Sequence, residues 1–225
     1  MKSPFPGFPP ETLKFLKQLK RNNNRPWFQA HKALYEEKVK RPMEELVLAL
    51  GGPMQSFAPD LVTDPKRAIF RIYRDTRFSP DKTPYKPHIA AHFSPRSVEG
   101  AGLYFQIDPE EVLIAGGIYM PGSAELRAIR NHIAGHSEEL RAILKRGEIK
   151  RLFGGLQGDQ LSRAPRGFPQ DHPALDLLKR KSLIVWFTRP SRLAEGPRLF
   201  PLLLESFIAV MPLVRYLNQP LKNIG

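Results

Sequence analysis

FRIYRDTRFSPDKTPYKPH, residues 70–88, is the stretch of this chain in which charged and aromatic side chains are most concentrated. Residues 69–78 are rich in aromatic and β-branched side chains and stop at a Ser-Pro pair, which is typical of a strand. Alternate side chains of a strand share a face. One face would carry Arg71, Tyr73, Asp75 and Arg77, and the more apolar face Phe70, Ile72, Arg74, Thr76 and Phe78.

Charged side chains on this strand need partners. Arg74 would lie on the apolar face, where an unpaired charge costs several kcal/mol, roughly, so it requires a carboxylate or a bound anion. Asp75 lies between Arg71 and Arg77 and is expected to orient both guanidinium groups. The strand therefore predicts an anion site.

The loop that follows supports the same prediction. Pro80, Pro84 and Pro87 fix φ and stiffen the loop, which carries Lys82, Tyr85 and Lys86. A stiff loop with these groups beside an arginine-rich strand is a preorganised clamp for an anion. The alternative is an internal ion-pair network that only fastens the loop to a sheet.

The remaining pattern predicts an α+β fold, with helices packed on a mostly antiparallel sheet of about five strands. We expect one domain over residues 1–225, made of N-terminal helices (1–52), a sheet core (68–192) and a C-terminal helix (193–225). Predicted strands cover 69–78, 89–93, 103–107, 112–120 and 181–188. Predicted helices cover 10–21, 27–40, 44–50 (stopped by Gly51-Gly52-Pro53), 123–136, 138–145, 173–180 and 199–216, with a loop over 146–172.

Composition limits the class of protein. The net charge is +13, and the basic segments 61–96 and 141–192 flank an acidic one, so anionic partners are expected. The absence of cysteine excludes disulfides and thiolate metal sites and fits a cytoplasmic location. No apolar run approaches the roughly 20 residues of a membrane helix. His132 and His136 lack a clear third ligand and no nucleotide fingerprint is present, so neither a metal nor a cofactor is expected.

A longer pattern in the central stretch resembles a known family. R-x-x-R-D-x-R-F-S-x-D-K-x-P-Y, residues 71–85, resembles the signature of a bacterial and fungal family of conserved hypothetical proteins, classed as a domain of unknown function. Residues 15–28, which include Asn22-Asn23-Asn24-Arg25-Pro26-Trp27-Phe28, and residues 163–173 are similar to other parts of that family. The resemblance implies no activity, cofactor or catalytic residue.

Three functions fit these observations. In the first, an anionic small molecule or nucleotide binds a pocket; the expected ligand-binding residues are Arg71, Arg74, Arg77, Lys82, Tyr85 and Arg166. If catalysis occurs, His172 or His88 is the expected proton carrier and Asp75 orients the arginines. The second function is nucleic-acid binding, since tyrosines and phenylalanines interleave with cations. The third is a non-enzymatic interaction module for an acidic partner. For His172 the alternative role is to cap the helix that follows it.

Overall fold

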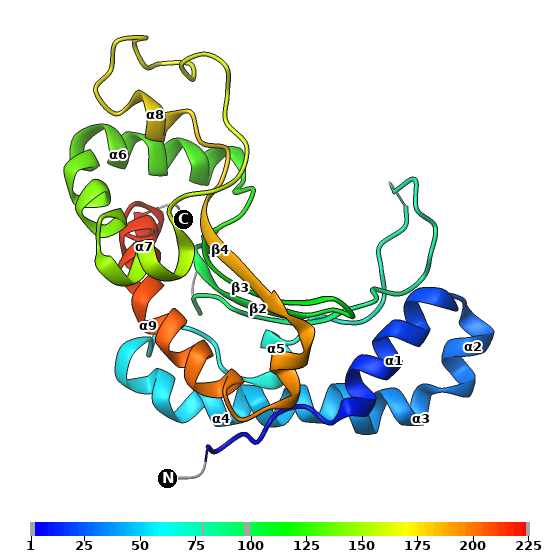
Figure 1. Cartoon of the computed structure of the whole chain (residues 1–225). Helices are drawn as coiled ribbons and strands as arrows, with labels where there is room; N and C mark the ends of the chain where they lie inside the picture. Colours follow the sequence, from blue (N-terminus) through cyan, green and yellow to red (C-terminus); the bar gives the residue numbers. More distant parts are fainter. Residues whose placement is uncertain (1–2, 78, 97–99, 224–225) are drawn as a thin grey trace. The chain divides into compact units, whose positions relative to one another are not determined.

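The computed structural model describes residues 3–77, 79–96 and 100–223 of the 225-residue chain (Figure 1). The chain forms two compact units. The first consists of Met1–Phe93, Tyr104–Ile114 and Thr188–Glu205, and the second of Ser94–Leu103, Ala115–Phe187 and Ser206–Gly225. Each unit is built from three separate stretches, so neither corresponds to one continuous segment of sequence.

The fold is α+β, and its described residues contain a four-stranded antiparallel sheet where about five strands were predicted. The strands are β1 (Ile89–Phe93), β2 (Gly102–Ile107), β3 (Glu111–Ile118) and β4 (Leu183–Pro190), and they lie in the order β1-β2-β3-β4. Buried residues dominate β1 and the second half of β3, as expected for strands covered by other elements.

The predicted strand over residues 69–78 is wrong. Isolated antiparallel bridges join Ile69 to Ala91 and Tyr73 to Tyr85, but no ladder forms over the described positions 69–77. Pro84 and Pro87 have no N–H, so the facing segment cannot donate a continuous series of hydrogen bonds. The predicted alternation is still visible in the burial, because positions 71, 73, 75 and 77 are exposed and positions 72, 74 and 76 are more buried. Phe78 lies outside the described residues.

Most of the first unit is helical. The helix α1 buries Phe15, Leu16 and Leu19, which recur at helical spacing. Helix α4 buries Met43, Leu46, Val47, Leu50 and Met54, and it contacts β1. The elements are α1 (Pro10–Arg21), α2 (Arg25–Ala30), α3 (Lys32–Tyr35), the π-helix η1 (Glu36–Lys40), α4 (Arg41–Phe57), α5 (Pro65–Ala68) and the 3-10 helix η2 (Ser191–Glu195).

Several helix boundaries of the first unit differ from the prediction. The helix predicted over 27–40 is interrupted at His31, where φ is −113° and ψ is 11°, and it resumes as α3 and η1. Gly51-Gly52-Pro53 does not stop α4, which continues to Phe57. Leu50 and Met54 are fully buried on either side of this tripeptide, so packing outweighs its low helix propensity.

Within the described residues, the second unit contains three further helices and a final 3-10 helix. Helix α6 (Ser123–Leu144) is kinked at His136, whose φ of −133° and ψ of 31° are not helical, in agreement with the two helices predicted there. The predicted loop over 146–172 contains α7 (Gly147–Phe153), and the helix predicted over 173–180 is only α8 (Leu175–Leu178). The 3-10 helix η3 (Pro220–Asn223) closes the described chain.

Gly117 occupies a position in β3 that excludes other residues. Its φ is 121°, and an added Cβ would lie 2.2 Å from the carbonyl oxygen of Leu183. A glycine is required where one backbone approaches another so closely.

The helix α9 (Leu199–Asn218) extends beyond Tyr216, its predicted end. Within the part of the chain that the structure describes, it alone has the length and composition to cross a membrane. However, 56% of its most apolar window is buried inside the protein, which is the pattern of a core helix.

Candidate functional site

A cavity of about 330 Å³ lies in the first unit, beside the central stretch of the sequence. It is lined by Arg25, Gln29, Tyr73, Arg74, Thr76, Pro84 and Tyr85. Most of the polar groups in this lining are N–H and O–H donors, and no carboxylate is present among the described lining residues. The cavity therefore presents positive charge and hydrogen-bond donors.

Helix α2 supplies Arg25 and Gln29. The side chain of Asn24 caps this helix by accepting a hydrogen bond of 3.0 Å from the backbone N–H of Trp27. Pro26 occupies the first turn, where its missing N–H has no cost. The cap sets the start of the helix, and the spacing of four residues then places Arg25 and Gln29 on one face.

Asn23 fastens the loop over residues 79–88 to the segment between α1 and α2. Its side-chain amide donates to the carbonyl of Tyr85 (2.9 Å) and accepts from the N–H of Tyr85 (3.1 Å). The Tyr85 ring stacks on Phe28 with 4.1 Å between ring centroids, and it is 1% exposed. These contacts join two segments that are 62 residues apart in the sequence.

The backbone on the other side of the cavity is fixed by two further hydrogen bonds. The N–H of Arg74 donates to the carbonyl of Pro84 (2.9 Å), and the N–H of Lys86 donates to the carbonyl of Ile72 (2.8 Å). With the Tyr73–Tyr85 bridge, they hold the two strand-like segments together. The positions of Tyr73 and Arg74 are therefore set before any ligand binds.

An ion pair orients Arg74. Its guanidinium group donates to the carboxylate of Asp81, whose other oxygen accepts the N–H of Thr83 at 2.9 Å. The hydrogen bonds from Thr83, followed by the one from Arg74, lower the pKa of Asp81. Of the two partners expected for Arg74, a carboxylate or a bound anion, the structure shows the carboxylate of Asp81. Because a guanidinium group has five N–H donors, this pair leaves Arg74 with further donors for a ligand.

Tyr85 remains a hydrogen-bond donor at neutral pH. Burial raises the pKa of its phenol, the neighbouring Tyr73 raises it further, and the Arg25 charge partly opposes the change. A neutral phenol can donate its O–H to an anion, whereas a phenolate could not.

Several of the predicted site residues do not line this cavity. Arg77 donates two hydrogen bonds to the carboxylate of Asp75, from Nε over 3.0 Å and from Nη2 over 2.7 Å. These hydrogen bonds lower the pKa of Asp75 to about 2. Arg71 is exposed and adds only its charge to this effect. Lys82 donates to the carbonyl of Thr76 (2.9 Å). Part of the cluster is thus the internal ion-pair network that was the alternative prediction.

His88 belongs to the first unit but also lies outside the lining of the cavity. Its pKa is lowered, chiefly by burial and then by the Lys86 ammonium, while Asp108 acts in the opposite direction. The imidazole is therefore neutral at pH 7.

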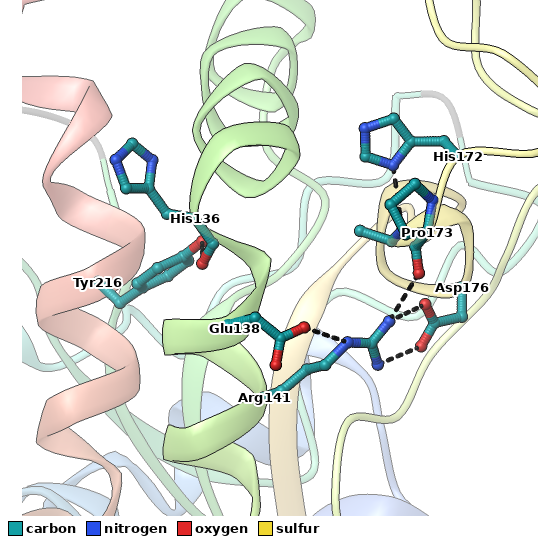
Figure 2. Close-up of polar contacts among 8 residues, drawn as sticks. His136, Glu138, Arg141, His172, Pro173, Asp176 and Tyr216 are labelled. Carbon is teal, nitrogen blue, oxygen red and sulfur yellow. Dashed lines mark hydrogen bonds and ion pairs between the residues drawn. The ribbon is translucent and has the colours of Figure 1, made fainter.

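The remaining predicted residues, Arg166 and His172, lie in the second unit. Arg166 is exposed. Nδ1 of His172 accepts the backbone N–H of Ala174 at 3.0 Å, so a neutral ring carries its proton on Nε2 (Figure 2). The predicted capping of the following helix is not seen, because α8 begins at Leu175 with Ala174 as its N-cap residue and no side chain caps it.

Beside His172, an arginine fork joins α6 to α8. The guanidinium group of Arg141 binds the two carboxylate oxygens of Asp176 at 3.0 and 2.7 Å and the carbonyl of Pro173 at 3.1 Å, and Glu138 lies at 3.7 Å (Figure 2). These partners satisfy Arg141 from within the chain, which indicates a structural role for it.

The predicted histidine pair also lies in this unit. The rings of His132 and His136 stack with 4.5 Å between centroids, and the Tyr216 hydroxyl donates to the His136 carbonyl at 3.1 Å. Over the described residues, no three His, Asp or Glu side chains gather as a metal site requires.

Of the predicted ligand-binding residues, the cavity brings together only Arg74 and Tyr85. The predicted ligand-binding residues did not include the other lining residues, Arg25, Gln29, Tyr73, Thr76 and Pro84. The Asn-Arg-Pro start of α2 was visible in the sequence, but no local pattern connects it to residues 73–85. That connection depends on the hydrogen bonds of Asn23.

The fold and this site define an α+β protein with a donor-lined, cationic pocket in its first unit. A family model described as conserved hypothetical protein (DUF2461) matches residues 11–216, so the chain belongs to this family. The predicted resemblance is confirmed at the level of the family, and the three segments on which it was based fall within the matched range. No curated protein and no solved structure matches the chain.

Proposed function

We propose that the pocket of the first unit binds the anionic group, phosphate or carboxylate, of a small molecule. One observation carries this proposal: Arg25 and Arg74 line the same cavity, and no acidic side chain lines it among the described residues. Because Asp81 already pairs with Arg74, the attraction of the cavity for an anion rests on the charge of Arg25 and on the remaining N–H donors of Arg74.

Each lining residue has a role in this proposal. Arg25 and Arg74 donate charge-assisted hydrogen bonds to the anion, and Asp81 holds Arg74 in place without entering the pocket. Tyr85, Gln29 and Thr76 add neutral donors. The volume of about 330 Å³ lies at the lower end of the range of roughly 300–1,000 Å³ for ligand pockets, so one small molecule fills it.

The proposal is one of binding and includes no reaction. Neither His88 nor Asp75 lines the pocket, and a carboxylate with a pKa of about 2 is a weak base at neutral pH.

Calorimetric titration with inorganic phosphate and with small phosphorylated and carboxylated compounds tests the proposal. Arg25→Gln removes an exposed guanidinium group from the pocket, and Arg74→Ala removes the paired one. Each is expected to weaken binding at least about tenfold, since a hydrogen bond to a charged group contributes roughly 1.5–3 kcal/mol. Arg77→Gln, in the same segment but outside the pocket, is the matched control and should bind like the unmodified protein.

Two outcomes contradict the proposal. The first is binding that Arg25→Gln and Arg77→Gln weaken equally, because the general positive charge would then be responsible. The second is an absence of small-anion binding together with binding of random DNA or RNA that falls steeply between low and physiological salt. That result would identify a nucleic-acid surface.

A further inference from the structure

The pocket contains one aromatic ring that the protein itself does not cover. Tyr73 lines the cavity and is 49% exposed, although large aromatic side chains are usually buried. The second aromatic ring of the lining, Tyr85, is 1% exposed because Phe28 stacks on its face. Tyr73 is therefore the ring available to a ligand.

The contacts of Tyr73 fix its ring and leave much of it open. Phe28 meets it in an edge-on arrangement with 6.4 Å between centroids, and Tyr85 lies tilted at 5.5 Å. The backbone bridge to Tyr85 and the hydrogen bonds of the residues on either side hold the main chain. A ring that is both fixed and exposed binds a planar partner with little loss of conformational freedom.

The charged groups share the cavity with this ring. Arg74 and Arg25 both line the small cavity that Tyr73 lines. A ligand that engages all three carries an anionic group and, within the length of one small molecule, a flat ring system. Nucleobases stack on tyrosine in this way, and every base has a suitable face.

We infer that the ligand of the pocket is a nucleoside monophosphate, with its phosphate on Arg25 and Arg74 and its base stacked on Tyr73. This inference rests on the proposed anion-binding function and adds the class of ligand to it. The cavity of about 330 Å³ favours a mononucleotide over a dinucleotide cofactor.

The test compares adenosine monophosphate with ribose phosphate, which has the anion and lacks the base. By calorimetry, adenosine monophosphate is expected to bind about 5- to 150-fold more tightly, the range expected for stacking of one base. Tyr73→Leu should remove this advantage and leave the affinity for ribose phosphate unchanged. Phe70→Leu is the matched control, because Phe70 is 44% exposed in the same segment and does not line the pocket.

The outcomes separate the inference from the proposed function. Equal affinities for the two compounds, both lost in Arg25→Gln, would overturn the inference and leave the anion-binding function intact. An equal loss of affinity for both compounds in Tyr73→Leu would also overturn the inference, because the ring would then support the structure of the pocket and would not stack on the base. If neither compound binds, the proposed function itself is contradicted. Thermal unfolding of Tyr73→Leu and Phe70→Leu identifies any general loss of folding.

Discussion

Replacement of Asn23 by alanine should destabilise the first unit and disrupt the pocket together. Asn23 makes two hydrogen bonds with the backbone of Tyr85, donating over 2.9 Å and accepting over 3.1 Å. Each contributes roughly 0.5–1.5 kcal/mol net, and a buried backbone group left without a partner costs roughly 1–3 kcal/mol. Because Tyr85 is 1% exposed, water reaches its backbone poorly, and we expect a loss of about 2–3 kcal/mol.

The neighbouring Asn22 provides a matched control. Its side chain makes one exposed hydrogen bond of 3.0 Å, to the carbonyl of Gln18. Asn22→Ala removes the same number of atoms from an adjacent position, yet it should cost less than about 1 kcal/mol, because water replaces the lost partner.

Urea denaturation followed by the fluorescence of Trp27 measures the difference. The chain has two tryptophans, so a Trp186→Phe background leaves Trp27, in the first unit, as the only one. The ligand affinity of Asn23→Ala should fall as well, because Asn23 holds Tyr85 in the pocket wall. If Asn23→Ala is no less stable than Asn22→Ala, the loop is fixed by other contacts and the reasoning is wrong.

Two other predictions concern ionisation and backbone conformation. The carboxyl group of Asp75 should titrate near pH 2 when followed by NMR. Its contribution to stability is therefore present above pH 3.8, its unperturbed pKa, and is lost as the pH falls toward 2. Arg77→Gln should return the pKa of Asp75 toward 3.8, and an unchanged pKa would refute the assignment. Gly117→Ala should destabilise the protein by several kcal/mol, roughly, because the added Cβ meets the Leu183 carbonyl oxygen. Gly135→Ala, which places its Cβ in open space on α6, should stabilise the protein slightly. Equal unfolding midpoints of the two variants would contradict this prediction.

The elements predicted well from the sequence are those with strong local patterns. Helix α1 has the predicted limits, because its apolar stripe and charged last turn act over neighbouring residues only. Strand β1 also has the predicted limits. The pairing of Asp75 with Arg77 was visible for the same reason, since two residues on one face of an extended segment meet without help from the rest of the fold.

The elements predicted poorly are those in which packing outweighs local propensity. Buried Leu50 and Met54 carry α4 through two glycines and a proline, although each of these residues weakens a helix. Segment 69–78 has the composition of a strand, but its partner segment contains prolines that cannot complete a ladder. In both cases the deciding contact is made with residues outside the predicted element.

The sequence by itself determined the α+β class, the alternation of exposed and buried side chains over residues 71–77, and the surplus of positive charge. Only the tertiary structure decided which of the cations share a pocket. Arg25 joins Arg74 because Asn23 binds the backbone of Tyr85 across 62 residues, while Arg77, closer in sequence, is held outside by Asp75. Periodicity describes which face a side chain occupies, but a pocket depends on long-range hydrogen bonds and packing that bring separate faces together.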